Sequence, residues 1–328
     1  MADQPAAADV VKGELPLLTL SERDVAELLD DRALLDALEG GFRDLSRGVV
    51  QVPDRPDVSV PGGLVLAMPA WRPGSPIGVK LVSLFAGNLA RGLPSHLALI
   101  ALLDPETGAP LCVMDGTYVT GARTAGATMV SVRLLAREDA RVATIVGAGV
   151  QAREHLRLLP LVRDVERVFV ASEYPHDAER LAGRDPRAEA TGDLEAAVRA
   201  SDVVCLCTSS SQPVLDPDWV RPGTHVTSIG YAPPGGELPR ALAERARLFV
   251  ETVSAFEAPP VGCAELAGVD PGRGAELGQV LLGEAPARTS EDEVTVYKAM
   301  GNAIEDLVAA ELVYRTALER GQGAITML

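Results

Sequence analysis

The sequence predicts an α/β protein that contains two kinds of sheet. Between residues 49 and 114, short apolar runs alternate with turns rich in Pro, Gly and Asp, a pattern typical of a mainly antiparallel sheet. After residue 142, strand-like runs alternate with helical patterns, which predicts a doubly wound parallel sheet. A glycine-rich turn directly after the first of these parallel strands is the third observation. The length of 328 residues, 47% of them apolar, suits about two domains.

Composition argues against several classes of partner. The formal net charge is −16 at pH 7, so the chain would repel nucleic acids and anionic membranes, and we expect neither as a partner. No apolar run approaches the ~20 residues of a membrane-spanning helix. The cysteines and histidines are scattered without metal-ligand spacing, so we expect no metal site, no disulfides and a cytoplasmic location.

The first half begins with a tail and a helical region. Residues 1–16 are expected to form a flexible N-terminal tail, because the stretch up to Glu14 is rich in Ala and Asp and contains no apolar segment. Ser21 followed by Asp24 is typical of a helix start in which each side chain caps the other residue's backbone. Apolar residues from Val25 to Leu38 then predict two short helices, divided at Asp30-Asp31.

Further elements follow from the spacing of apolar residues. In the first half, strands are expected at Leu64–Met68, Gly78–Leu84, Leu97–Leu103 and Leu111–Met114, followed by a helix at Thr124–Leu135. In the second half, strands are expected at 142–146, 167–171, 202–207, 225–229 and 247–251, and helices at 155–161, 177–182 and 193–200. The stretch Val296–Arg320 predicts one long helix, with an apolar face that would include Ile304, Leu307, Val308, Leu312 and Leu318.

The glycine turn has the form of a dinucleotide-binding fingerprint. The β-branched run Val142–Val146 is followed by Gly147, Ala148, Gly149, Val150, Gln151 and Ala152, and then by a helical pattern. Gly147 would permit the tight turn, and Gly149 would let backbone N–H groups approach a pyrophosphate at the start of the helix. Ala152 fills the third small position, where helix and strand pack closely. The second half is therefore predicted to be a Rossmann domain, since this motif lies between a strand and a helix.

The end of the next strand bears on the choice of dinucleotide. Ser172 and Glu173 lie about 20 residues beyond the glycine turn, where a carboxylate can bind the adenine ribose hydroxyls. No Arg or Lys stands there, so NAD is favoured and NADP is the second candidate. Glu173 could equally be a solvated loop charge. Thr208, Ile229 and Gly230 end later strands and are candidate cofactor neighbours, although polar residues are common at strand ends.

Several short segments occur in an order that resembles the ornithine cyclodeaminase/μ-crystallin family. They are Val52-Pro53-Asp54-Arg55, Ala67-Met68-Pro69, Gly78 to Val82, Gly92 to His96, Asp104 to Gly108, Met114-Asp115-Gly116, Thr120 to Ala125, the glycine turn, Tyr297-Lys298 and Asp306-Leu307. The resemblance extends over nearly the whole chain from about Leu17. The pairing of Arg123-Thr124-Ala125 with the glycine turn about 20 residues later is its most specific part.

The resemblance implies a fold, an assembly and a site. It implies a split substrate-binding and dimerisation domain, residues 17–124 with 303–328, around a Rossmann domain at 125–302, and homodimers that join their antiparallel sheets. Arg55 and Lys80 match positions that hold the substrate carboxylate and the reacting centre, and Ser95 matches a small hydroxyl position near the nicotinamide. Arg123 and Thr124 match a pair that contacts the cofactor phosphates, and Lys298 matches a cofactor-side position.

The chemistry of these residues fits the implied roles. A guanidinium such as that of Arg55 binds a carboxylate bidentately and stays charged. Lys80 lies between Val79 and Leu81 in an apolar strand, where burial would lower its pKa toward the range useful for proton transfer. The plainer alternatives are an edge-strand charge for Lys80 and a surface charge for Arg55. His96, next to Ser95, is as well explained by a structural role.

Two positions depart from the cyclodeaminase pattern. Ornithine cyclodeaminases carry a Glu just before the Met-Pro element, where this chain has Leu66 or Ala67, and an Asp where this chain has Ala232. Glu237 is offset from that Asp and resembles a later Glu-Leu element of the family. The substrate pocket would therefore include Leu66, Tyr231 and Ala232, and would be smaller and more apolar than an ornithine pocket.

The sequence thus predicts an NAD(P)-dependent oxidoreductase that acts on an α-amino or α-imino acid. The shared half-reaction is hydride transfer between nicotinamide and the α-carbon, as in an amino acid dehydrogenase or an imine reductase. A cyclodeaminase with catalytic NAD is the first alternative. A binding protein for cofactor and small ligands is the second.

Overall fold

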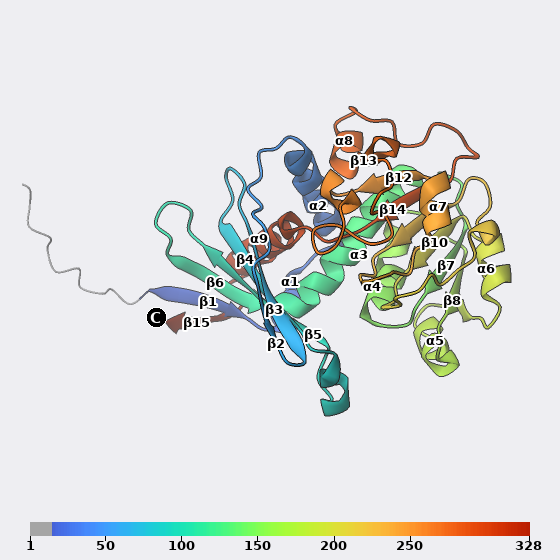
Figure 1. The fold of residues 1–328 in the computed structure, drawn as a ribbon. Helices are drawn as coiled ribbons and strands as arrows, with labels where there is room; N and C mark the ends of the chain where they lie inside the picture. The colour runs from blue at the N-terminus through green and yellow to red at the C-terminus, as the bar shows by residue number, and fades with distance from the viewer. Residues whose placement is uncertain (1–14) are drawn as a thin grey trace, which may run out of the picture.

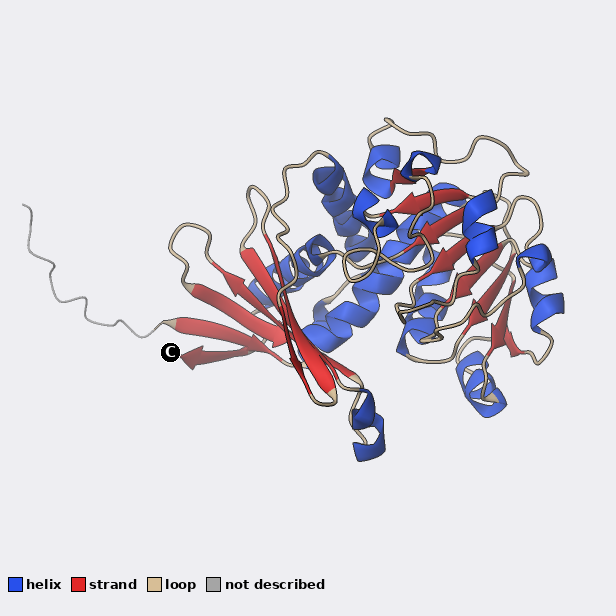
Figure 2. Ribbon diagram, viewed as in Figure 1, coloured by secondary structure: helices blue, strands red, loops and turns tan. Residues whose placement is uncertain are grey.

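The computed structural model describes residues 15–328 and contains two separate sheets (Figure 1). Helices α2 (Asp31–Ser46), α3 (Gly116–Leu135) and α9 (Ala303–Arg320) pack on one another between the sheets (Figure 2). No helix in this part of the chain is long and apolar enough to cross a membrane. The α/β class with one parallel and one mainly antiparallel sheet is confirmed.

The seven-stranded sheet is antiparallel except at one pair. Its order is β15-β1-β6-β5-β4-β3-β2, and β1 pairs with β6 in parallel. The strands are β1 (Pro16–Leu20), β2 (Asp57–Val60), β3 (Gly63–Ala70), β4 (Ile77–Leu84), β5 (His96–Leu103), β6 (Pro110–Asp115) and β15 (Ala324–Met327). The expected tail lies outside the described residues except for its last two positions, and Pro16 begins β1. Strands β1, β2 and β15 were not predicted from the sequence.

Helices cover the inner face of this sheet. Helix α1 (Glu22–Leu28) begins at Ser21, whose reciprocal cap with Asp24 is confirmed. Helix α9 packs on β3, β4 and β5. Gly78 in β4 approaches α9 so closely that a Cβ would lie 2.9 Å from a methyl carbon of Leu307. Strand alternation then turns every second residue of β4 toward α9, including Lys80. A short 3-10 helix, η1 (Ala86–Arg91), connects β4 to β5.

The eight-stranded sheet is parallel throughout, in the order β13-β12-β14-β11-β10-β7-β8-β9. Its strands are β7 (Val142–Val146), β8 (Arg167–Ala171), β9 (Ala188–Ala190), β10 (Val203–Leu206), β11 (His225–Ser228), β12 (Arg247–Val250), β13 (Gly274–Glu276) and β14 (Thr295–Lys298). Its helices are α4 (Val150–Leu158), α5 (Pro175–Ala182), α6 (Leu194–Ala200), α7 (Arg240–Arg245) and α8 (Leu277–Leu281). Short 3-10 helices lie at η2 (Leu159–Leu161), η3 (Pro217–Trp219), η4 (Val253–Phe256) and η5 (Pro271–Arg273).

The prediction of one helix over Val296–Arg320 is wrong at its beginning. Residues 295–298 form β14, which lies between β11 and β12 and is buried on both faces. A short apolar run buried on both faces has no strand periodicity, so it cannot be told from a helix by spacing. The helix starts only after Gly301, which has a φ of +70°, and Asn302, which caps it. Leu318, expected on the apolar face, is exposed.

Helix α3 begins eight residues earlier than expected. Asp115 caps it by accepting a hydrogen bond from the amide of Tyr118 at 2.7 Å. Gly116 and Gly121 lower the helix propensity of this first part, which hides it in the sequence. Gly116 is required by packing, since a Cβ there would lie 3.0 Å from the backbone of Ala98 in β5. Thr124 therefore lies inside one continuous helix that contacts strands of both sheets.

Candidate active site

The glycine turn joins β7 to α4 at the carboxyl edge of the parallel sheet. Gly147 has a φ of +112°, and a Cβ there would lie 2.4 Å from the carbonyl oxygen of Cys207, so no other residue fits. Gly149 begins α4 without any side-chain cap, and the space around its Cβ position is open for 4 Å. A helix start with free amides beside an open glycine suits a pyrophosphate. The turn therefore fits the dinucleotide that the sequence predicted, with Ala148 between the two glycines and Val150 and Gln151 as the first residues of α4.

The neighbouring strand ends lie at the same edge of the sheet. Ser172 and exposed Glu173 follow β8, Thr208 follows β10, and Ile229 and Gly230 follow β11. Because these strands are parallel, their carboxyl ends gather where open α/β sheets bind ligands. The structure thus brings the predicted cofactor neighbours together. The polar groups of the last three, however, point to buried Glu237.

A second set of charged residues, which we call the Lys80 cluster, comprises Lys80, Arg123, Glu305 and Asp306. Lys80 is only 2% exposed, and its Nζ lies 2.7 Å from Oδ2 of Asp306 without an aligned hydrogen bond, so the contact is an ion pair. Arg123 donates from Nε to Oδ1 of Asp306 and from Nη1 to Oε2 of Glu305, each at 2.8 Å. Three elements, β4, α3 and α9, meet at this cluster.

Burial and charge set the protonation of the cluster. Burial, together with the nearby Arg123 guanidinium, lowers the pKa of Lys80 to about 8, although Asp306 opposes the shift. Burial raises the pKa of Glu305 above its usual range, against the opposing effect of Arg123. Lys80 can therefore gain or lose a proton near neutral pH. The solvent-facing alternative for Lys80 is excluded by its burial.

Arg55 lies beside this cluster, in the loop before β2. Its Nη2 donates to the carbonyl oxygen of Gly301, in the turn that leads into α9 and to Asp306. Burial raises the pKa of the Tyr231 phenol, and the positive charge of Arg55 acts against that shift. Arg55 is exposed and free to change partners.

Ser95 and His96 belong to the same neighbourhood. The Ser95 hydroxyl lies 3.1 Å from Nδ1 of His96. The pairing of β4 with β5 puts His96 on the same face of the sheet as Lys80, and burial and the charge of Lys80 both lower the pKa of His96. The neutral ring and the hydroxyl are therefore available as polar contacts near the ammonium.

The apolar lining expected for the substrate follows from strand geometry. Leu66 points to the same face of β3 as Met68, which pairs with Lys80 across the strands. Ala232 lies in the loop after β11, where it bridges to Gly235. Neither position carries a carboxylate, and Tyr231, the residue before Ala232, is half-exposed.

The side chains of Lys298 and Arg123 both bind other groups of the protein, although the sequence predicted that they contact the cofactor. Lys298 is fully buried and donates to the Gly230 carbonyl, to Ser228 Oγ at 3.2 Å and to Glu265 at 2.8 Å. The guanidinium of Arg123 faces the two acids of α9. The phosphate role of Arg123 and the cofactor role of Lys298 stay predictions, and Thr124 stays one too.

Sequence reasoning used Asp306 only as part of the family pattern, gave it no role, and missed Glu305 and Glu251. Glu305 and Asp306 are two adjacent acids on a helix whose neighbours Ile304 and Leu307 are buried, and this contrast was the available signal. Glu251 accepts hydrogen bonds from the Tyr297 hydroxyl and from the amides of Met300 and Gly301. It thereby fixes the turn that presents α9 to Lys80.

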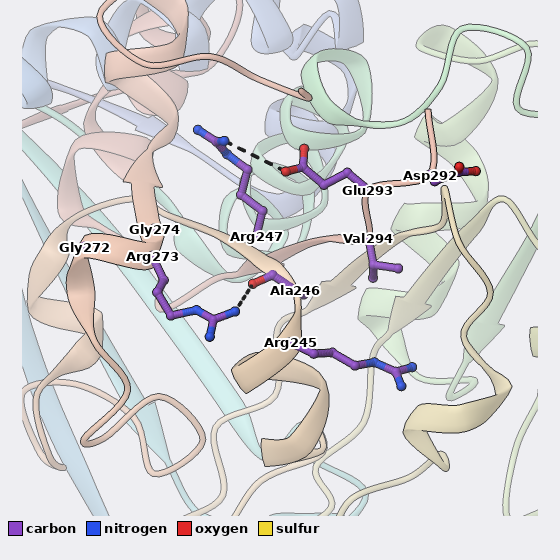
Figure 3. A pocket seen from close by; sticks show the side chains of 9 residues that line it. All are labelled: Arg245, Ala246, Arg247, Gly272, Arg273, Gly274, Asp292, Glu293 and Val294. Carbon is purple, nitrogen blue, oxygen red and sulfur yellow. Dashed lines mark hydrogen bonds and ion pairs between the residues drawn. The ribbon is translucent and has the colours of Figure 1, made fainter. Parts of the chain in front are cut away.

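Two cavities lie away from these residues. One, of about 570 Å³, is lined by Arg245, Ala246, Arg247, Gly272, Arg273, Gly274, Asp292, Glu293 and Val294 (Figure 3). It lies at the amino ends of β12, β13 and β14, the edge opposite the glycine turn. Arg247 and Arg245 each contact an acid, and Arg273 contacts a carbonyl oxygen. A second, of about 540 Å³, lies between α5 and β9.

The parallel sheet with its glycine turn defines a dinucleotide-binding protein that carries a second, antiparallel sheet. The chain belongs to the ornithine cyclodeaminase/mu-crystallin family, whose family model matches residues 17–321. The resemblance seen in the sequence is therefore confirmed.

Three relatives illustrate the likeness. Ketimine reductase mu-crystallin of Mus musculus is 34% identical over 304 residues, which cover 90% of this chain and 96% of that protein. The Thermococcus litoralis Delta(1)-pyrroline-2-carboxylate reductase, solved with NADH and L-proline, superposes with a TM-score of 0.88 at 33% identity, over 94% of this chain and 99% of that one. An archaeal alanine dehydrogenase dimer with bound NAD superposes with a TM-score of 0.88 at 32% identity, over 95% and 99%.

Proposed function

We propose that this protein interconverts a small α-imino acid and the corresponding α-amino acid, with Lys80 as the proton-handling residue. The chain is an NAD(P)-dependent oxidoreductase of imines or amino acids, the class to which its named relatives belong. The observation that carries the proposal is a fully buried lysine with a pKa near 8, paired to Asp306 beside two arginines.

NAD is the cofactor, as in the solved relatives that hold NADH or NAD. We assign its pyrophosphate to the Gly147–Gln151 turn and its adenine ribose to Ser172 and Glu173. NADP is the second candidate, although no cation follows β8 directly to receive a ribose phosphate. When bound, the nicotinamide supplies or accepts the hydride.

The chain's own residues divide the remaining work. Arg55 exchanges the neutral Gly301 carbonyl for the substrate carboxylate, which is the stronger acceptor. Lys80 donates a proton to the imine nitrogen during reduction and takes the same proton back from that nitrogen during oxidation. Asp306 holds the Lys80 ammonium in place, and Arg123 in turn holds the Asp306 carboxylate. Reduction of one C=N bond thus consumes one proton and one hydride.

The substrate side chain is small or cyclic in this proposal. Leu66 and Ala232 offer no carboxylate to hold a distal amine or to activate an attacking group. Tyr231 adds aromatic surface. This chain therefore lacks the acids that a cyclodeaminase needs for its reaction. Cyclic ketimines or alanine-like amino acids fit the site better as substrates.

We further propose that the protein is a homodimer in the cytoplasm. Strands β2 to β5 expose a row of apolar side chains on the outer face of the antiparallel sheet: Val58, Val60, Val65, Leu81, Leu97 and Leu99. A contiguous exposed patch of this kind favours self-association. The division of the chain into residues 17–124 with 303–328 and residues 125–302 belongs to the same proposal. The four cysteines are buried and free.

The test is NADH oxidation over a panel of cyclic imines and of 2-oxo acids with ammonia or amines. We expect stoichiometric NADH consumption with at least one substrate. Lys80→Met, which keeps the volume and leaves Asp306 paired with Arg123, should lower kcat at least 100-fold, about 3 kcal/mol in the barrier, with NADH affinity retained.

Arg23→Ala, at an exposed helix position, is the matched control and should change neither constant. Ammonia release from ornithine without net NADH change would instead support a cyclodeaminase. NADH binding without turnover of any substrate would support a binding protein. Activity that survives both Lys80→Met and Arg55→Ala would show that the site is elsewhere.

A further inference from the structure

Glu237 is a fully buried carboxylate with five hydrogen-bond donors around it. Its Oε2 accepts from the amide and the hydroxyl of Thr208, both at 2.7 Å. Its Oε1 accepts from the Ser228 hydroxyl at 3.0 Å, the Ile229 amide at 3.0 Å and the Gly230 amide at 2.7 Å. One oxygen therefore holds the end of β10, and the other holds the end of β11.

We propose that Glu237 is a positioning residue that sets the spacing of these two strand ends, and through them shapes the cofactor turn and the substrate-side loop. The inference rests on the proposed cofactor and substrate site. Glu237 acts through backbone segments and touches neither ligand.

The first connection runs to the glycine turn. Thr208 directly follows Cys207, whose carbonyl oxygen lies only 2.4 Å from where a Cβ of Gly147 would be. The backbone of residues 207–208 therefore packs directly against the glycine turn. A displacement of Thr208 by a few tenths of an ångström would shift the backbone on which Gly147 packs, because no free space separates the two segments.

The second connection runs to the loop after β11. Gly230 would bring a Cβ within 2.6 Å of the Thr208 carbonyl, so the two strand ends are in direct contact. The Gly230 amide donates to Glu237, while its carbonyl accepts from Lys298. Tyr231 follows at once. Glu237 therefore holds the amide of Gly230, and Lys298 holds its carbonyl oxygen. Together they fix the backbone directly before Tyr231.

Only a carboxylate of this length satisfies the arrangement. An ionised carboxylate is acceptor-only, and all five partners donate. Glutamine would turn an NH₂ group toward either the Thr208 amide or the Ile229 and Gly230 amides, and these backbone donors cannot reverse. Aspartate keeps the charge but is one carbon shorter, so it cannot reach both strand ends. Loss of such charge-assisted bonds in a buried site is costly.

The experiment compares Glu237→Gln with Ser228→Ala, which removes one of the five donors and leaves the carboxylate and all backbone donors in place. NADH dissociation constants and steady-state constants are measured at a temperature where each variant is folded. We expect Glu237→Gln to weaken NADH binding about tenfold and to lower kcat as well, and Ser228→Ala to change both less than threefold. A purely stabilising role would lower Tm but leave these constants unchanged.

The proposal is overturned if Glu237→Gln binds NADH and turns over within twofold of the parent, whatever its Tm. If that variant does not fold, Glu237→Asp takes its place, with the same expectation at smaller size and the same overturning result. Failure of the proposed function is distinguishable, since the parent would then bind NADH without turnover while Glu237→Gln still lost NADH affinity.

Discussion

Lys80 is a residue in which two opposing effects nearly balance. Removing the ammonium from water disfavours its charged form, and Arg123 adds repulsion, whereas Asp306 attracts it at 2.7 Å. Burial wins, but only in part, so the pKa falls to about 8 rather than lower. The same residue is therefore charged at neutral pH and able to release its proton in mild alkali.

The rate of imine reduction should consequently fall as pH rises through about 8, because the protonated form of Lys80 is the donor. The oxidative rate should rise over the same window. Asp306→Asn removes the charge that raises the Lys80 pKa, so the fall in the reductive rate should move to lower pH. A kcat profile from pH 6 to 10 measures both.

Glu106→Gln, in the exposed turn between β5 and β6, is the control and should leave the profile unchanged. A shift to higher pH in Asp306→Asn would contradict the assignment.

The lowered pKa of Lys80 also affects the pH dependence of stability. Between pH of about 8 and the ordinary pKa of 10.5, the unfolded chain holds the proton that the folded chain has lost. The contribution of Lys80 to the free energy of unfolding therefore rises with pH over this range.

At the level of elements, the β7–turn–α4 unit separates two uses of glycine. Gly147 is needed by the fold, because its φ is positive and a Cβ would strike the Cys207 carbonyl. Gly149 has an ordinary φ of −82° and open space around its Cβ position, so the fold alone would accept another residue there.

Gly147→Ala should therefore destabilise the protein by about 2 kcal/mol or more and abolish NADH binding. Gly149→Ala should fold like the parent yet bind NADH at least tenfold more weakly, since its methyl group occupies the space where the pyrophosphate approaches the amides. Thermal unfolding and NADH titration read out the two effects separately. Parent-like NADH affinity in Gly149→Ala would mean that the phosphates lie elsewhere.

Elements with a clean local period were predicted well. β7 and β8 have the predicted limits, and the Ser21 cap has the predicted partners. β14 was mistaken for helix because its residues are buried on both faces. The first eight residues of α3 were missed because Gly116 and Gly121 lower the helix propensity there, and Gly116 is required by its packing on β5. These errors arise where tertiary contacts override local preference.

At the scale of the whole molecule, the outer face of the antiparallel sheet carries the proposed assembly. Leu81 and Leu99 lie directly opposite each other on β4 and β5, and both are about two-fifths exposed, at 40% and 43%. In a two-fold dimer this patch would meet its own copy.

Leu81→Lys combined with Leu99→Lys should therefore convert a dimer to a monomer, because like charges would face one another across the interface. Val253→Lys, at an exposed position on η4 beside the parallel sheet, is the matched control and should stay dimeric. Light scattering after size exclusion distinguishes the two states. A parent that is monomeric at micromolar concentration would contradict the proposal.

Many residues of the site could be predicted from the sequence, but the ion pairs between them could not. The glycine turn, Glu173, Lys80 and Arg55 stand in the sequence with recognisable neighbours. The pairing of Lys80 with Asp306, and of Arg123 with Glu305, joins residues 226 and 182 positions apart, which no local pattern reveals. Glu237 was noticed only as an offset acid, whereas five donors converge on it.

The amino-acid order was sufficient for the class of fold, the family and the dinucleotide turn, because these depend on short-range periodicity and on glycines whose backbone demands are local. Packing of three distant elements decided which acids meet Lys80, how far water is excluded from it and hence where its proton is lost. Those quantities are properties of burial and distance, and both exist only once the chain has folded.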